Sequence, residues 1–505
     1  MTGVRFDRLF RTRSIDALIA ASEEPENRLR KTLGPWSLTA LGIGIVIGSG
    51  IFTVTGTAAA GHVERIESIF HATILDLTLH GTHAGSMMGR PGAGPAISIS
   101  FILVAIACAF AGLCYAELAS MIPIAGSAYT YAFAILGEIV AWIIGWDLIL
   151  EYAVGNMSVA VGFSAYLQDL GDNLFGFHLP AVIAFPHFPA PGQPAGFFNI
   201  PALAITLGVT WILVRGVRES AGTNAAMVAM KITAIAFFCF GAAKGIQVEN
   251  WHPFAPHGFS GILTGASIVF FAYIGFDSVS TAAEECRRPQ RDLPIGIIAT
   301  LIVCTVLYCS VALVLTGIAH YETLNNDSPV ATALKALGYN RLRLVVTFGA
   351  LMGMMSSLLV GQYGQTRIWF AMSRDGLLPR IFSRVHPQYK TPHISTWIAG
   401  LVVGIPAGIW DIDTLAELTN IGTLFAFVVV SAGVIVLRRH QPERPRSFRV
   451  PFVPLVPILS IACCLLLMMG LPLITWIRFV VWLAIGLGIY AAFGSRHSVI
   501  GTPET

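Results

Sequence analysis

The stretch Gly42-Ile-Gly-Ile-Val-Ile-Gly-Ser-Gly-Ile-Phe52 lies in the middle of a hydrophobic span near residues 36–60. A membrane helix normally satisfies every backbone N–H and C=O internally, so glycines at its centre predict that this helix unwinds there. A second span is interrupted in the same way at Ala266-Ser-Ile-Val-Phe-Phe-Ala-Tyr-Ile-Gly-Phe-Asp-Ser278. Each interrupted span begins a set of five, and interruptions at corresponding positions of two halves indicate a binding site at mid-membrane depth.

The composition predicts an all-α polytopic membrane protein. The 505 residues are 55% hydrophobic and 12% charged, whereas soluble domains carry about 25% charged residues. A membrane span needs about 20 apolar residues, and twelve such spans can be read from the sequence. They lie near 36–60, 95–119, 128–166, 200–216, 220–242, 262–283, 293–318, 344–371, 395–410, 415–437, 453–470 and 473–493.

Lys and Arg are distributed unequally between the two sets of loops. If the N-terminus is inside, the inner segments hold 22 of them and the outer segments seven, with Lys231 and Arg367 within spans. Positive residues concentrate on the cytoplasmic side, so both termini are predicted to be cytoplasmic and the protein to lie in the cell membrane. The net charge of +3 reflects this rule and gives no reason to expect nucleic acid. The lipid bilayer is therefore one expected partner, and protein partners cannot be read from the sequence.

The predicted organisation is one transmembrane domain flanked by two short tails. The first apolar run follows about 35 polar residues and continues as a full span, so no cleavable signal peptide is expected. The basic N-terminal tail is either an amphipathic helix on the inner membrane surface or simply a segment that sets orientation. The segments are a tail at 1–35, a transmembrane domain at 36–493 (helices 1–5 in about 36–242, 6–10 in about 262–437, 11–12 in about 453–493), an extended outer loop at 62–93 and a tail at 494–505.

The outer loop contains His62, His71, His80 and His83. Imidazole is a suitable zinc ligand, but this spacing matches no closed zinc pattern. We therefore predict no metal site there.

Four motifs occur in order along the spans. They are Gly42–Phe52 as quoted, Cys114-Tyr-Ala-Glu-Leu-Ala-Ser-Met-Ile-Pro-Ile-Ala-Gly-Ser-Ala-Tyr-Thr-Tyr131, Glu284-Glu-Cys-Arg-Arg-Pro-Gln-Arg-Asp-Leu-Pro-Ile-Gly296 and Ser373-Arg-Asp-Gly-Leu-Leu-Pro379. Through them the chain resembles the amino acid–polyamine–organocation (APC) superfamily, and within it the cationic amino acid transporter family and bacterial amino acid permeases. The resemblance runs from Thr32 to about Phe493, although the 62–93 loop is longer than the family leads us to expect.

The resemblance implies a leucine-transporter-like fold, in which two inverted repeats of five helices carry two additional helices. It also implies a secondary transporter that moves amino acids by alternating access. The members most similar to this chain are driven by protons. An amino acid and protons are therefore the expected ligands.

Ile47, Gly48, Ser49 and Gly50 are the candidates to bind the substrate carboxylate. Unwinding there exposes backbone N–H groups at the start of a half-helix, and such ends attract anions. The alternative is close helix packing, which small residues also permit.

Phe271, Ala272 and Ile274 are the corresponding candidates on the second interrupted span. Carbonyls released there can accept hydrogen bonds from the substrate's amino group. The resemblance implies that Phe271 closes over the substrate, and ordinary packing is the alternative.

Lys231 lies in the middle of the fifth span, where an ionisable residue is costly and suggests function. A lysine in such surroundings can gain and lose a proton. In proton-coupled relatives a lysine at this place substitutes for an ion. We therefore expect its ammonium to bridge the carbonyls of the first span and the hydroxyls of Ser356 and Ser357. That serine pair also matches a sodium-ligand pair in sodium-coupled relatives, so a sodium site stays open.

Glu151 lies one turn after Asp147 on the third span and is a candidate to hold a cationic substrate side chain. Pairing with a buried amide, or a position near the outer interface, are alternatives. The name of the cationic amino acid transporter family and the carboxylate of Glu151 both favour arginine, lysine or ornithine as substrate. Small neutral amino acids such as alanine are the alternative. A sensor that binds without transporting is an alternative of another class. The sequence has no metalloprotease helix, nucleophile elbow or phosphate loop, so neither enzymatic activity nor a cofactor is expected.

Overall fold

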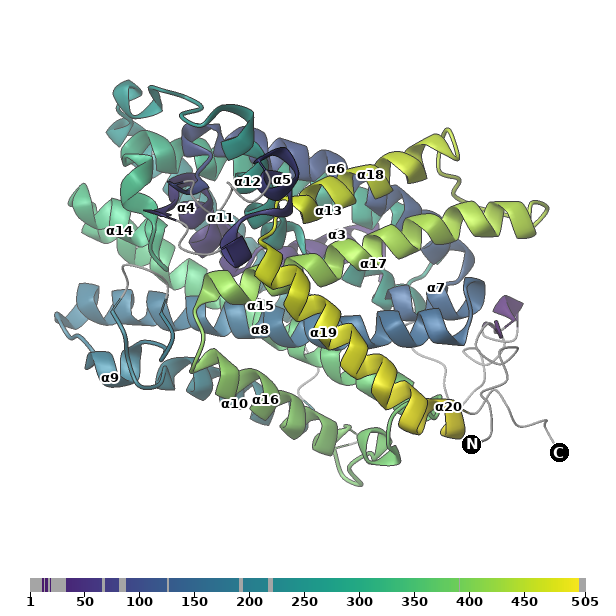
Figure 1. Cartoon of the computed structure of the whole chain (residues 1–505). Helices are drawn as coiled ribbons and strands as arrows, with labels where there is room; N and C mark the ends of the chain where they lie inside the picture. Colours follow the sequence, from purple (N-terminus) through teal and green to yellow (C-terminus); the bar gives the residue numbers. More distant parts are fainter. Residues whose placement is uncertain are drawn as a thin grey trace.

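The computed structural model of the chain is a bundle of helices with one small β-ladder (Figure 1). All structural statements below concern the residues that it describes. These are 11–12, 14–16, 19, 33–65, 69–80, 88–124, 127–189, 194–216, 221–389 and 391–498.

Eight helical stretches of the described residues are long and apolar enough to cross a membrane. Three further apolar helices are shorter, at 15 residues each. The long stretches are built on α6 (Ile97–Met121), α8 (Glu138–Phe175), α11 (Ala221–Ala242), α12 (Gly258–Val269), α13 (Pro289–Ile318), α15 (Asn340–Arg374), α17 (Ile412–His440) and α19 (Leu473–Ile489); the shorter helices are α10 (Ile200–Val214), α16 (His393–Ala407) and α18 (Leu455–Met469).

The first span is a bent pair of helices rather than one rod. The helix α3 (Pro35–Val46) and the segment Gly50–Ala60 are inclined at 46° to each other. The second segment consists of the wide turn η1 (Gly50–Val54) and α4 (Thr55–Ala60). The interruption predicted from the glycines is confirmed.

The third expected span, 128–166, was wrong as a single helix. The structure divides it into α7 (Ser127–Ile135) and α8. The division occurs at Gly137, whose φ of +98° is incompatible with a continuous right-handed helix. Glu138 directly follows this glycine and occupies the first turn of α8, so a glycine and an acidic residue mark the corner within a largely apolar stretch. The other expected spans coincide with helical stretches.

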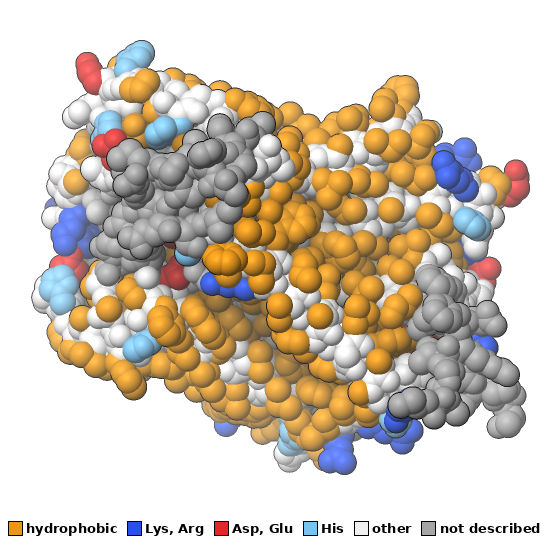
Figure 2. All heavy atoms as spheres, viewed as in Figure 1, with side chains coloured by type: hydrophobic (Ala, Val, Ile, Leu, Met, Phe, Trp, Pro, Cys, Tyr) orange, Lys and Arg blue, Asp and Glu red, His pale blue; other side chains and the backbone are white. Residues whose placement is uncertain are grey.

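The helices pack most extensively as α8 with α15, α6 with α13, and α17 with α8. Glycine permits the close approach of α15 to α8, because an added Cβ at Gly361 would lie 2.3 Å from the side-chain oxygen of Asn156. Hydrophobic side chains cover most of the middle of one face, over α17, α18 and α19 (Figure 2). An apolar surface of that breadth is typical of a face in contact with lipid.

The last long helix, α19, contacts α8 through a pair of tryptophans, one on each helix. The rings of Trp146 and Trp482 stack with centroids 4.5 Å apart. Each indole N–H donates to the backbone carbonyl of the other residue, at 2.8 and 3.2 Å. The hydrogen bonds are therefore reciprocal.

The expected outer loop contains the only strands among the described residues. The strands β1 (Gly61–Arg65) and β2 (Met88–Pro91) pair antiparallel. No group of three metal-ligating side chains occurs among the residues that the structure describes, and His83 lies outside them. The remaining elements are η2 (Ile69–His71), α5 (Ile74–His80), η4 (Gly94–Ala96), α9 (Ala181–Ala184), η5 (Ala243–Gly245), η6 (Val248–Trp251), η7 (Phe270–Tyr273), η8 (Asp277–Glu285), η9 (Tyr321–Leu324), α14 (Pro329–Ala336), η10 (Arg380–Ser383), η11 (Tyr490–Gly494) and α20 (Ser495–His497).

Most of the predicted N-terminal tail lies outside the described residues. In the described part, Ile15 is buried and the carboxylate of Asp16 pairs with Arg444 at 2.7 Å. This contact joins the tail to the segment that follows α17.

Candidate functional site

The first interruption releases backbone groups in the interior of the bundle. Ile47 ends α3 in an extended conformation, with ψ of 94°, and η1 begins three residues later at Gly50. Ile47, Gly48, Ser49 and Gly50 are all buried. The carbonyls of the last turn of α3 therefore need partners from outside that helix.

Lys231 of α11 supplies those partners. Its side chain is fully buried, and its ammonium nitrogen donates hydrogen bonds to the carbonyl oxygens of Gly44 and, at 2.9 Å, Ile47. It also lies 3.5 Å from the Ser357 hydroxyl. A cation at this point faces the C-terminal, partially negative end of a half-helix, which is the favourable arrangement.

The two serines of α15 have different surroundings. The Ser357 hydroxyl lies 3.2–3.3 Å from the carbonyl oxygens of Gly44, Ile45 and Ile47. The Ser356 hydroxyl is fully buried and has no hydrogen-bond partner among the described residues. The expected bridge to both serines therefore involves Ser357 alone, because adjacent residues on a helix point in different directions.

The second interruption follows η7. Ile274 is extended, with ψ of 134°, and Gly275 has φ of +112°. A Cβ at Gly275 would lie 2.3 Å from a methyl carbon of Ile45, so this position needs glycine for both backbone and space. The segment η8 then begins at Asp277, which is buried.

The two interruptions contact each other. An added Cβ at Gly50 would lie 2.4 Å from the Cα of Ala272, so the two backbones pass closely. The hydroxyl of Tyr308, on α13, lies 2.9 Å from the carbonyl oxygens of both Val46 and Ala272. Tyr308 thus links the end of α3 to η7.

Two hydroxyls beside the first interruption have no hydrogen-bond partner among the described residues. These are the side chains of Ser49 and Thr53, both buried. An added Cβ at Gly162 of α8 would lie 3.1 Å from each of those side chains and 3.5 Å from the sulfur of Met354. Unpaired hydroxyls at an unwound helix fit a polar ligand, since buried polar groups are nearly always paired.

Phe271 is placed in η7, one residue before Ala272, and is buried with 7% of its surface exposed. The structure therefore brings Phe271, Ala272 and Ile274 together with the glycines of the first span. Whether Phe271 closes over a substrate stays a prediction.

Glu151 lies in a different part of α8 from Gly162. It precedes Gly162 by eleven positions on α8, an axial distance of about 16 Å. Its neighbours are Thr423, with which it is hydrogen-bonded, and the buried carboxyls of Asp147 and Asp277. Neither oxygen of Asp147 has a hydrogen-bond partner among the described residues. Glu151 thus belongs to a cluster of buried acids that includes Asp277, the first residue of η8 after the second interruption.

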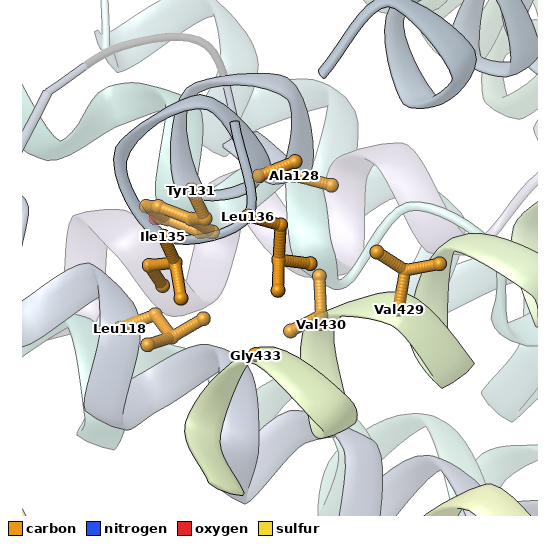
Figure 3. Close-up of a pocket in the computed structure, with 9 residues that line it drawn as sticks. Leu118, Ala128, Tyr131, Ile135, Leu136, Val429, Val430 and Gly433 are labelled. Carbon is orange, nitrogen blue, oxygen red and sulfur yellow. The ribbon is translucent and has the colours of Figure 1, made fainter. Parts of the chain in front are cut away.

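A small apolar cavity lies between α6, α7 and α17 (Figure 3). It holds about 10 Å³ and is lined by Leu118, Tyr131 and Val430, among others. A single water needs about that volume. This cavity is therefore a packing gap and not a substrate site.

The fold and the paired interruptions define a polytopic membrane protein with its candidate binding site between broken helices. The model of the amino acid permease family matches residues 33–490. The chain belongs to this family, which lies within the APC superfamily, and the resemblance noted from the motifs is confirmed.

Three relatives illustrate the range of the family. The chain is 46% identical to a methylthioribose transporter of Bacillus subtilis, over 97% of this chain and 99% of the relative. It is 44% identical to a branched-chain amino acid permease of the same organism, over 97% and 98%. It is 36% identical to cationic amino acid transporter 9 of Arabidopsis thaliana, over 83% and 68%. These relatives are transporters and permeases, as expected for a chain without enzyme motifs.

Sequence reasoning missed Thr53, Tyr308 and Gly275 as parts of the site. Thr53 and Gly275 lie within the quoted interruptions or one residue beyond, so proximity to the glycines was an available signal. Tyr308 lies in the span 293–318 with no local mark. Only the three-dimensional packing of α13 against both interruptions identifies it.

Proposed function

We propose that this chain is a proton-coupled amino acid transporter of the cell membrane that works by alternating access. In this proposal the segments from α3 to α11 and from α12 to α17 are two inverted five-helix repeats, and α18 and α19 are additional. The matching positions of the two interruptions support that arrangement. The excess of basic residues in one set of loops supports cytoplasmic termini.

The observation that carries the proposal is the position of Lys231. An ammonium donates to two carbonyls at the end of α3 and lies beside Ser357. Loss of its proton removes a charge–dipole attraction that holds the inner half of the first span in place. Protonation and the position of that half-helix are thereby coupled, which is what symport requires.

The substrate's two charged groups have matching sites in this proposal. Its carboxylate accepts hydrogen bonds from N–H groups of Gly48, Ser49 and Gly50, while its amino group donates to carbonyls near Phe271, Ala272 and Ile274. The unpaired hydroxyls of Ser49 and Thr53 support a polar ligand beside the first interruption.

We propose a neutral amino acid with an apolar side chain as the substrate. The surroundings of Ser49 and Thr53 at the first interruption include Gly162 and the sulfur of Met354, which suit an apolar side chain. The name of the branched-chain permease agrees with a neutral substrate. Arginine, lysine and ornithine, the expectation from sequence, are the competing class.

Uptake into proteoliposomes tests this function. Labelled valine, alanine and arginine would be supplied under an inward proton gradient without sodium, with unlabelled methylthioribose as competitor. We expect valine and alanine to accumulate, and Lys231→Ala to abolish accumulation while binding persists. Accumulation that needs sodium would instead assign an ion to the Ser356–Ser357 region. Saturable binding without any flux would favour an amino acid sensor.

A further inference from the structure

A groove of about 560 Å³ lies along the first half of α13. Arg291, Ile295, Ile298 and Ile302 line it at intervals of three or four residues, so they form one continuous helix face. Ile295 and Ile302 are 42% and 61% exposed. Within the described structure this face is not covered by another helix.

One end of the groove is basic. Arg291 lines it, and the neighbouring Arg287 and Arg288 are exposed. The opposite wall consists of Ser447 and Phe448, which precede the exposed Arg449. The first turn of α13 already contains the buried carboxyl of Asp292, so the arginines rather than the helix start would hold an anion here. An anionic group is therefore favoured at this end.

The rest of the groove is apolar and has the length of one lipid leaflet. Arg291 and Ile302 are eleven positions apart on α13, an axial distance of about 16 Å. Half of the hydrocarbon core of a bilayer is about 15 Å. A phosphate at Arg291 would therefore place an acyl chain over Ile295, Ile298 and Ile302 as far as the membrane midplane.

We propose that the groove binds one anionic phospholipid, with its phosphate at Arg291 and an acyl chain along the isoleucines. Basic pockets beside membrane helices are suited to such headgroups. A free phosphate would use only the basic end, and a helix of a second copy would use only the apolar face. A lipid is the ligand that uses both the basic end and the apolar face of the groove.

Native mass spectrometry of the full chain in detergent tests the proposal. The protein would be titrated with phosphatidylglycerol and with phosphatidylcholine of the same acyl chains. We expect wild type to prefer phosphatidylglycerol, and Arg291→Ala to weaken that binding about fivefold. Arg291→Lys should retain most of the affinity. The matched control is Arg384→Ala, which removes an exposed arginine outside the groove and should change nothing.

A second variant tests the apolar part. Ile298→Trp fills the groove and should reduce binding of both lipids while leaving the basic end intact. Equal binding of the two lipids by wild type, or full retention by Arg291→Ala, would overturn the proposal. So would displacement of the lipid by millimolar inorganic phosphate, or a dimer that Ile298→Trp dissociates. Because Arg291 is exposed, its substitution leaves the packed core unchanged.

Discussion

At the interruption after α3 a buried cation meets carbonyl oxygens, whereas at the interruption before η8 a buried carboxyl occupies the first position of a helical segment. Lys231 faces the negative end of one half-helix, and Asp277 lies at the positive end of the other. Both arrangements are electrostatically favourable. They differ in origin: Lys231 is supplied by a separate helix, while Asp277 belongs to the interrupted segment itself. In the proposed mechanism the charge on α11 couples a proton to the relative movement of α11 and α3.

The largest effect is expected for Lys231→Met, which keeps an unbranched side chain, one atom shorter, and removes the charge. Two buried carbonyls then lose a charged donor, so proton-driven uptake should fall about 100-fold. The measurement is accumulation of labelled valine in proteoliposomes at an imposed pH gradient. Exchange at equal pH on both sides is the control. Undiminished proton-driven accumulation by this variant would remove Lys231 from the coupling mechanism.

Gly275→Ala tests whether the second interruption depends on backbone shape. Its Cβ would lie 2.3 Å from Ile45, and its φ is +112°, so we expect a loss of about 2–4 kcal/mol in the free energy of unfolding. Thermal unfolding in detergent measures this. Gly208→Ala on α10 is the matched control, because nothing lies within 4 Å of its added Cβ. A stability of Gly275→Ala equal to that of the control would contradict the structure at this point.

Tyr308→Phe removes only the hydroxyl that links the two interruptions. A neutral hydrogen bond contributes about 1 kcal/mol, so uptake should fall about fivefold. Tyr273→Phe provides a comparison, since that hydroxyl bonds to Phe101 and Thr305 instead of joining the two interruptions. Equal uptake by the two variants would show that the link between the interruptions is unimportant.

The smallest effect is expected for Asp277→Asn. The amide keeps the shape of the side chain, so uptake should change less than about threefold and remain dependent on the proton gradient. The initial rate at several external pH values measures this. If uptake by Asp277→Asn no longer depended on the proton gradient while uptake by Lys231→Met still did, Asp277 rather than Lys231 would be the coupling group.

The sequence predicted the positions of both interruptions and the residues that lie at them, because glycine within an apolar span has a direct consequence for the backbone. It also identified Lys231 as a buried charge. It did not distinguish Ser356 from Ser357, since their directions depend on how α15 is rotated against α3. Tyr308 and the position of Asp277 beside Glu151 were inaccessible for the same reason: both depend on contacts between helices distant in sequence. The corner at Gly137 was missed because apolar residues flank Gly137 and Glu138 on both sides, so the stretch reads as one span.

The stacked indoles of Trp146 and Trp482 provide a natural optical probe. Two chromophores 4.5 Å apart couple strongly, so their near-ultraviolet circular dichroism depends on the distance and angle between α8 and α19. Their reciprocal hydrogen bonds fix that geometry in the present conformation. A spectrum that stays constant while substrate is transported would show that the two helices move as one body, and no label would be needed to record it.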